Sequence, residues 1–350
     1  MNWDMKTRLT SAGYLCRNQV KRRPHSEQNF LPQIKFSRCY FNTKFKTMRR
    51  FFNYLFFSLF IPMALHAQIP ESQSSAALAA RIQPAPDEVF SKFREVGMQP
   101  VNHILTAKEK DKVAKAFTML SPLHGKILKQ HLHSISFMDN MPNTALTSPV
   151  ETADSTQKFN ITFRAEIINE TVSQWATWKE NTYYTFPKDS GMEITIDAGE
   201  LDAMVYVLLH EATHVVDAVL ALTPHSGEGD TVVTPTAFTR GIWHTSNVPE
   251  KAFISPLLAT TRFRSGKQVP VSDAPKIYKE LQKTPFASLY STAAWFEDLA
   301  ELVSIYHLTA KLNQPFQISV KQNSKKIMGF EPMKNKLVKK RLEQLKVFYE

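Results

Sequence analysis

Two histidines and a glutamate near the middle of the chain have the spacing of a metal-dependent hydrolytic site. The segment His210-Glu211-Ala212-Thr213-His214 places the histidines four residues apart. On an α-helix their side chains differ in direction by only about 40°, so both imidazoles can bind one metal ion. Glu211 lies about 100° away, where it can act as a general base on a metal-activated water without binding the metal. Zinc suits two neutral imidazoles and a carboxylate, so we expect one zinc ion per chain.

The segment around this motif is predicted to be a buried helix. Residues 201–222 are apolar on nearly every side, and Thr223-Pro224 ends the pattern. A competing interpretation has two core histidines that are satisfied by ordinary hydrogen bonds. That interpretation must also bury Glu211 at considerable cost, and for this reason we favour a metal site.

The third metal ligand must come from another part of the chain. A metzincin continuation would need Gly and His where the sequence has Asp217 and Leu220. A later predicted helix carries Glu297 and Glu301 on one face, so that one carboxylate can bind metal while the other hydrogen-bonds a ligand histidine. We expect Glu297 to be the ligand, with Asp298 and Glu301 as alternatives. Taken alone, these acidic residues could also form a solvated stripe.

At these residues the chain resembles the gluzincin metallopeptidases, and more closely their lethal-factor-like branch. The matching segments are HEATHVVD (210–217) and PFASLYSTAAWFEDLAE (285–301). The resemblance implies zinc held by His210, His214 and Glu297, with Glu211 as the general base.

The resemblance also implies roles for three residues near the ligands. The Tyr290 hydroxyl would stabilise the developing oxyanion. Asp217 and Glu301 would not bind the metal but would orient the ligand side chains through hydrogen bonds. His214 and Glu297 are 83 residues apart, which is longer than in compact members of the branch. We therefore expect an insertion at about 223–285.

The positive charge of the chain is concentrated in its first fifty residues. The 350 residues include 43 Lys plus Arg and 32 Asp plus Glu, a formal net charge of +11. Residues 1–50 contain 12 of the basic residues and 2 of the acidic ones, so the rest of the chain is nearly neutral. A nearly neutral body disfavours a nucleic-acid-binding protein.

The layout of residues 48–67 is typical of a secretory signal peptide. Arg49 and Arg50 precede an apolar run at 51–65, and Ala67 offers a cleavage site. We interpret 1–47, which contains both cysteines (Cys16 and Cys39), as a non-native upstream extension. The expected protein is secreted or periplasmic and has no disulfide.

The rest of the sequence predicts an α+β, zincin-like fold in which a small twisted sheet packs on the HExxH helix. We expect a flexible leader at 68–105, a catalytic domain at 106–312 and a basic helical tail at 313–350. Thr106 is the predicted N-cap of the first helix. The other predicted elements are strands at 159–168, 182–186 and 192–196, a loop at 138–158 and a last helix at 291–312.

These features predict a secreted, monomeric zinc metalloendopeptidase with a protein or peptide substrate. Neither nucleic acid nor a stable membrane span after signal cleavage is expected. The edge strand of the sheet would pair with an extended peptide. Two alternatives stay open: a non-catalytic secreted binding protein with a zincin fold, and an anionic-surface binder that uses the Lys-rich tail. The intact Glu211 disfavours the first, and the nearly neutral body disfavours the second.

Overall fold

The computed structural model describes residues 71–350 except 96, 152–155, 226–233 and 262–266. The upstream extension at 1–47 and the signal peptide at 48–67 lie outside the described residues. Helices and strands are mixed along the described chain, which confirms an α+β protein.

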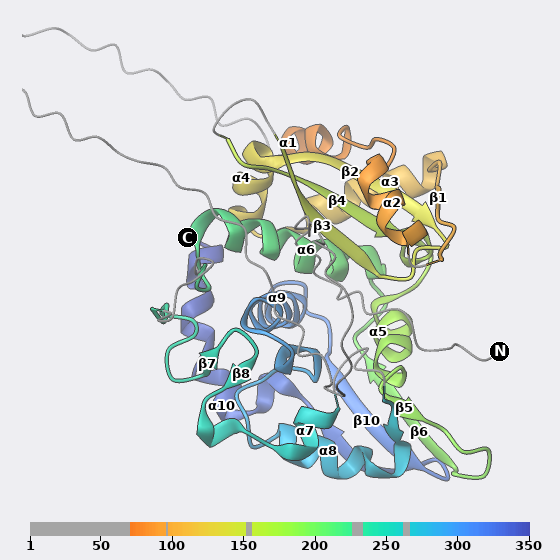
Figure 1. Ribbon diagram of the computed structural model, residues 1–350, viewed down its shortest axis with the longest axis vertical. Helices are drawn as coiled ribbons and strands as arrows, with labels where there is room; N and C mark the ends of the chain where they lie inside the picture. Colours follow the sequence, from red (N-terminus) through yellow and green to blue (C-terminus); the bar gives the residue numbers. More distant parts are fainter. Residues whose placement is uncertain (1–70, 96, 152–155, 226–233, 262–266) are drawn as a thin grey trace, which may run out of the picture.

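The first part of the described chain forms a four-stranded sheet with helices around it (Figure 1). The strand order is β1-β2-β4-β3; β2 and β4 are parallel, and the other neighbours are antiparallel. Strand β3 therefore lies at an edge. The elements are α1 (Glu71–Ala79), α2 (Asp87–Glu95), β1 (Val101–Asn102), α3 (Ala107–Thr118), α4 (Pro122–His131), β2 (Leu132–Asp139), β3 (Ala145–Val150) and β4 (Lys158–Arg164).

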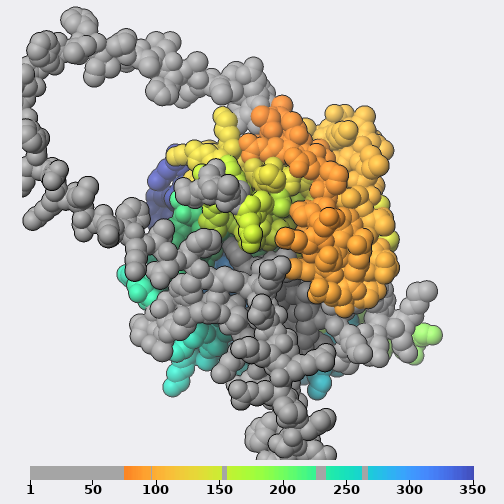
Figure 2. Space-filling model, turned by 45° about the horizontal axis from the view of Figure 1, so that its top comes forward, coloured from red at the N-terminus to blue at the C-terminus, as the bar shows by residue number. Residues whose placement is uncertain are grey.

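The prediction of a flexible leader at 68–105 is wrong from residue 71 onward. This stretch contains α1, α2 and β1, and Figure 2 shows the segment from α1 to α3 (orange) as a continuous part of the molecular surface. Leu78 of α1 is buried in the main core, and Phe90 and Phe93 of α2 are buried against Met138 of β2. The Ser-, Ala- and Pro-rich composition suggested a linker, but a few well-spaced apolar side chains are enough to dock both helices.

The predicted loop at 138–158 is also wrong in part, because it contains the edge strand β3. Four consecutive residues of β3, from Ala145 to Ser148, are buried. Burial on both faces removes the apolar–polar alternation by which a half-exposed strand is recognised. The predicted N-cap is confirmed: Thr106 begins α3 in a capping box with Glu109.

Helix α6 (Ala203–Leu220) carries the HExxH motif and lies between the sheet and the rest of the chain (Figure 1). It contacts α3, α4 and β3 on the sheet side, and α5 and α9 on the other. Every residue from Ala203 to Asp217 is buried, which confirms the predicted buried helix. Among the described residues, only α6 is long and apolar enough to cross a membrane, and 83% of it is buried inside the protein.

The second part of the described chain packs on the opposite side of α6. Its three-stranded antiparallel sheet has the order β11-β10-β6, and this part also contains two small strand pairs, β5-β9 and β7-β8. The elements are α5 (Val172–Asn181), β5 (Tyr184–Thr185), β6 (Met192–Asp197), β7 (Trp243–Thr245), β8 (Val248–Pro249), α7 (Pro256–Thr260), β9 (Val269–Pro270), α8 (Ala274–Leu281), α9 (Trp295–Tyr306), β10 (Gln317–Gln322), β11 (Lys325–Phe330) and α10 (Lys336–Lys339).

Three predicted elements differ clearly in extent from the structure. The strand expected at 182–186 is confined to Tyr184–Thr185. The strand expected at 159–168 ends at Arg164 and continues as a 3-10 turn, Ala165–Ile168. The helix expected at 291–312 begins as an α-helix only at Trp295 and ends in a π-helical turn, His307–Lys311.

The prediction of a helical tail at 313–350 is wrong in its first half. Strand β10 pairs with β6 and with β11, so the tail begins as a hairpin that completes the second sheet. Only the end of the chain is helical, with α10 and a 3-10 helix at Leu342–Phe348. The expected apolar stripe packs into the core, where Val338 and Leu345 are fully buried. The difference has a physical reason: alternating residues in a hairpin can bury one face as well as a helical stripe can.

Candidate metal centre

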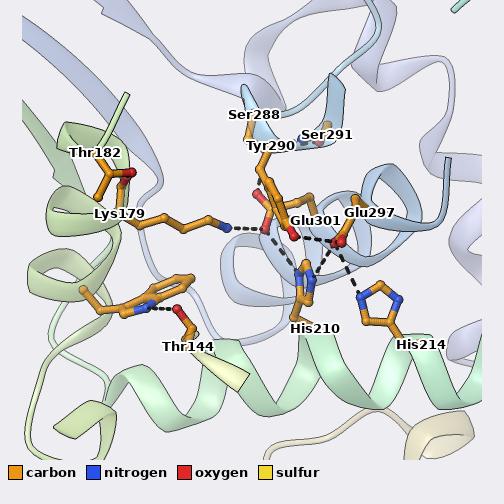
Figure 3. A network of polar contacts seen from close by, with 11 residues as sticks. Thr144, Lys179, Thr182, His210, His214, Ser288, Tyr290, Ser291, Glu297 and Glu301 are labelled. Atoms are coloured by element: carbon orange, nitrogen blue, oxygen red, sulfur yellow. Dashed lines mark hydrogen bonds and ion pairs between the residues drawn. The ribbon is translucent and has the colours of Figure 1, made fainter. Parts of the chain in front are cut away.

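Three side chains from two helices meet at one buried point. His210 and His214 project from α6, and Glu297 projects from the first turn of α9, which packs against α6 (Figure 3). Their ligand atoms all lie within 4.8 Å of one another. Glu297 Oε2 is 3.1 Å from His210 Nε2 and 3.5 Å from His214 Nε2. Within the described part of the chain, this is the one group of three or more metal-ligating residues that are this close together.

The donors of this cluster fit a metal ion. His214 Nε2 is buried and has no hydrogen-bond partner among the described residues, although buried nitrogens are normally paired. The two imidazole rings lie 4.8 Å apart at 83° to each other, and both Nε2 atoms face the same carboxylate oxygen. A cation between them would satisfy the nitrogens and the carboxylate together. The buried group can therefore hold a metal ion.

Charge at the cluster is balanced between the histidines and the acids. Burial disfavours an imidazolium at His210, but hydrogen bonds to Glu297 and Glu301 outweigh burial and raise the pKa of His210 to about 9. Burial likewise disfavours a charged Glu297, yet its contacts with both histidines hold the pKa of this carboxyl well below its usual range. The site thus favours a carboxylate at Glu297 and a positive charge facing it, which a metal ion can supply instead of a proton.

Glu301 contacts the opposite edge of the His210 ring. Its Oε1 lies 3.3 Å from His210 Nδ1, and its Oε2 accepts a 2.6 Å hydrogen bond from Ser288 Oγ. The ammonium of Lys179 on α5 is 3.3 Å from Oε1. Burial favours a neutral Glu301, but Lys179 and His210 outweigh it and lower the pKa of Glu301 to about 2. Glu301 therefore contacts the candidate ligand His210 from the side away from Glu297, as expected, and is not itself part of the candidate ligand group.

Asp298 is bound to other partners and takes no part in the cluster. Its carboxylate forms a two-pronged ion pair with Arg341, at 3.0 and 2.6 Å, and accepts a 2.9 Å hydrogen bond from Trp243 Nε1. Of the three candidate acids, only Glu297 groups with both histidines. A solvated acidic stripe is contradicted, because Glu297, Asp298 and Glu301 are all at most 3% exposed.

Tyr290 reaches the cluster from the 3-10 turn that precedes α9, Tyr290–Thr292. Its hydroxyl donates a 2.7 Å hydrogen bond to Glu297 Oε1, and its ring stacks on His210 with 5.9 Å between centroids. Tyr290 thus lies beside two members of the candidate metal site, and its role at an oxyanion stays a prediction.

Glu211 points toward the edge strand of the first sheet. Its Oε2 accepts a 2.6 Å hydrogen bond from Thr147 Oγ1, and Thr147 belongs to β3. Burial raises the pKa of Glu211, while His214, His210 and Thr147 oppose the rise. A buried carboxyl with a raised pKa beside a candidate metal site is suited to take up and release a proton.

Asp217 was expected to orient a metal ligand, but its hydrogen bonds are made with Thr223 instead. Its carboxylate accepts two 2.6 Å hydrogen bonds from Thr223, one from the backbone N–H and one from the hydroxyl. Between them the chain turns at Ala221, which has a left-handed φ of 51°. Asp217 therefore closes the turn after α6, a role that a carboxylate at a helix C-terminus can have when N–H groups face it.

Sequence reasoning missed several residues that contact the site residues, among them Thr147, Lys179 and Ser288. Thr147 lay in a predicted loop, and Lys179 is 122 residues from its partner Glu301, so no local pattern indicated either. Ser288 lies within the segment that carries the family resemblance, which is the only signal that could have found it.

No protein-family model, curated protein or solved structure matches this chain.

Proposed function

We propose that this protein is a secreted zinc metallopeptidase with a zincin-like fold of the gluzincin type, similar to the lethal-factor-like branch. The single observation that carries the proposal is the buried His210–His214–Glu297 cluster with Glu211 next to it on α6. A non-catalytic binding protein would have no need for a buried carboxylate at position 211.

The choice of zinc rests on the chemistry of the donors. Two imidazole nitrogens and one carboxylate oxygen are one of the ligand sets of catalytic zinc sites, which leave a further position open. His210, His214 and Glu297 would hold the ion. When bound, zinc supplies Lewis acidity that polarises a carbonyl and makes a water acidic, with a pKa near about 7.

Glu211 and Tyr290 are assigned the remaining chemical roles. Glu211 would take a proton from the attacking water at its carboxylate and pass it to the leaving amine nitrogen. In the structure the Tyr290 hydroxyl donates a hydrogen bond to Glu297. During the reaction it would instead donate to the oxyanion of the scissile peptide.

Strand β3 is the proposed binding edge for the substrate. It is an edge strand in the sheet, and its residue Thr147 touches Glu211. An extended peptide that adds to a sheet edge is held by main-chain hydrogen bonds, so its peptide bonds would run past the base. This arrangement favours a peptide or protein substrate over a small ester.

The test uses the full chain and measures zinc content and peptide hydrolysis together. We expect about one zinc per wild-type chain, loss of zinc in Glu297→Gln, and retained zinc with no hydrolysis in Glu211→Gln. The matched control is Glu180→Gln, because Glu180 is also a buried glutamate but is bonded to Tyr278 rather than to the cluster. Wild-type protein without zinc would overturn the proposal, and zinc without hydrolysis of any peptide would favour the non-catalytic alternative.

A further inference from the structure

We propose that Lys179 is a positioning residue for the metal centre: its ammonium orients Glu301, and Glu301 in turn orients His210. This inference rests on the proposed function, because it assumes that His210 binds a metal. The resemblance to the gluzincins does not supply it, since Lys179 lies outside both matching segments.

The contacts form a continuous chain from α5 to the cluster (Figure 3). Lys179 Nζ lies 3.3 Å from Glu301 Oε1, and the same oxygen lies 3.3 Å from His210 Nδ1. The other nitrogen of that ring, Nε2, faces Glu297. The Lys179 side chain is only 12% exposed and that of Glu301 only 4%, so solvent screens the pair weakly.

The position of Lys179 is itself well defined. Its ammonium lies 3.9 Å above the ring centroid of Tyr290 and 5.2 Å from that of Trp175, one turn earlier on α5. Trp175 is fixed by a hydrogen bond to Thr144 and by a ring contact with Tyr206 of α6. The lysine is therefore held between two aromatic rings, one of which belongs to the site.

These contacts determine which way the Glu301 carboxylate faces. Ser288 binds Oε2 and Lys179 binds Oε1, so rotation of the carboxylate plane is restricted from both sides. With Oε1 held against Nδ1, a His210 ring that binds a metal would keep its proton on Nδ1 and use the Nε2 lone pair as the ligand. The lysine also compensates a buried negative charge that would otherwise be costly next to Glu297.

The experiment compares Lys179→Met, Lys179→Arg and Lys112→Met with wild type in the full chain. Lys112 is a matched control, because it makes a partly buried ion pair with Asp202 at 2.9 Å and does not touch the cluster. Zinc affinity is measured by competition with a chromogenic chelator, and ligand geometry by the visible spectrum of the Co²⁺ form. We expect Lys179→Met to weaken zinc binding about 10- to 100-fold and to alter the cobalt spectrum. Lys179→Arg and Lys112→Met should bind zinc like the wild type.

A double-mutant cycle tests whether Lys179 acts through Glu301. In a Glu301→Gln background, Lys179→Met should cause no further loss of zinc affinity, because the carboxylate that it orients is gone. The double variant also lacks the Glu301 carboxylate that Lys179→Met would leave buried and unpaired. If Lys179→Met alone does not fold, the double variant can still be compared with Glu301→Gln.

The outcomes separate this inference from the proposed function. Wild-type zinc affinity and an unchanged cobalt spectrum in Lys179→Met would overturn the inference alone, as would an additive loss in the double variant. Failure of the wild-type protein to bind either metal would overturn the proposed function and the inference with it.

Discussion

Thr147 donates a 2.6 Å hydrogen bond to Glu211, and this bond joins the edge strand of the first sheet to the HExxH helix. Both residues are buried, at 6% and 3% exposure. The strand that we propose for substrate binding is thus in direct contact with the proposed general base. A peptide that pairs with β3 would find the carboxylate already oriented by the strand.

Replacement of Thr147 by Val should impair the general base without removing metal. The hydroxyl stabilises the charged form of Glu211, so its loss should raise the pKa of that carboxyl further. We expect unchanged zinc content, a lower kcat and an acid limb of the pH–rate profile shifted to higher pH. The control is Thr162→Val, which removes a buried hydroxyl bond to Ser136 in the same sheet. An unshifted acid limb in Thr147→Val would contradict the role of this bond.

The residues of the HExxH motif could be predicted from sequence because the helical repeat alone brings them together. His210 and His214 need only one helix turn, and the N-cap Thr106 needs only the three residues up to Glu109. Glu297 was predicted from its own helix pattern and the family resemblance. The structure groups it with the histidines even though it is 87 residues from His210.

Contacts between distant elements could not be predicted in the same way. Thr147 and Lys179 reach the site only because β3 and α5 pack beside α6, and that packing depends on the whole core. The tail shows the same limit: its apolar residues indicated burial correctly, but a helix and a hairpin bury such residues equally well.

Arg341 should be essential for stability because it neutralises Asp298 next to the proposed ligand Glu297. The Asp298 side chain is 0% exposed and that of Arg341 3%, and Arg341 also donates a 2.9 Å hydrogen bond to the carbonyl of Pro285. We expect Arg341→Met to lower the free energy of unfolding by about 3–5 kcal/mol, since it leaves a buried charge unpaired.

The double variant Arg341→Met/Asp298→Asn should recover part of that loss. Lys346→Met is the control in the same C-terminal segment, because its ion pair with Glu343 is exposed and should contribute little. Urea denaturation gives the free energy of unfolding of wild type, Arg341→Met, the double variant and Lys346→Met. Equal stability of wild type and Arg341→Met would contradict the assigned role of this ion pair.

Removal of the metal should lower the melting temperature. The proposed ligands come from α6 and α9, so an ion bound to both helices would stabilise only the folded chain. At a free metal concentration of about 1,000 times Kd, the gain is about 4 kcal/mol. Thermal unfolding with and without a chelator measures the shift. Zn²⁺ should restore the melting temperature and Mg²⁺ should not, because Mg²⁺ prefers oxygen ligands. Glu297→Gln should show no such shift, and a chelator effect of wild-type size in this variant would refute the ligand assignment.

Acid should destabilise the protein through His124, which supports α6 from α4. The His124 ring is fully buried, with Nδ1 2.7 Å from Ser121 Oγ and Nε2 3.0 Å from Thr213 Oγ1. Burial, with a smaller effect of His307, lowers the pKa of His124 to about 3. The folded state therefore keeps this ring neutral at a pH where the unfolded chain has protonated it.

The sign of the effect follows from this difference in proton binding. Between the ordinary value of 6.5 and about 3 the unfolded state binds the extra proton, so stability is full above pH 6.5 and falls as the pH is lowered. From pH 8 to pH 5, His124 should contribute a loss of about 2 kcal/mol. Other groups also titrate in this range, so we compare the change between the two pH values in wild type and in His124→Gln. The loss should be smaller by that amount in His124→Gln and unaltered in His133→Gln, whose side chain is exposed. If wild type and His124→Gln lose the same free energy of unfolding between pH 8 and pH 5, the buried His124 ring is not the source of this pH dependence.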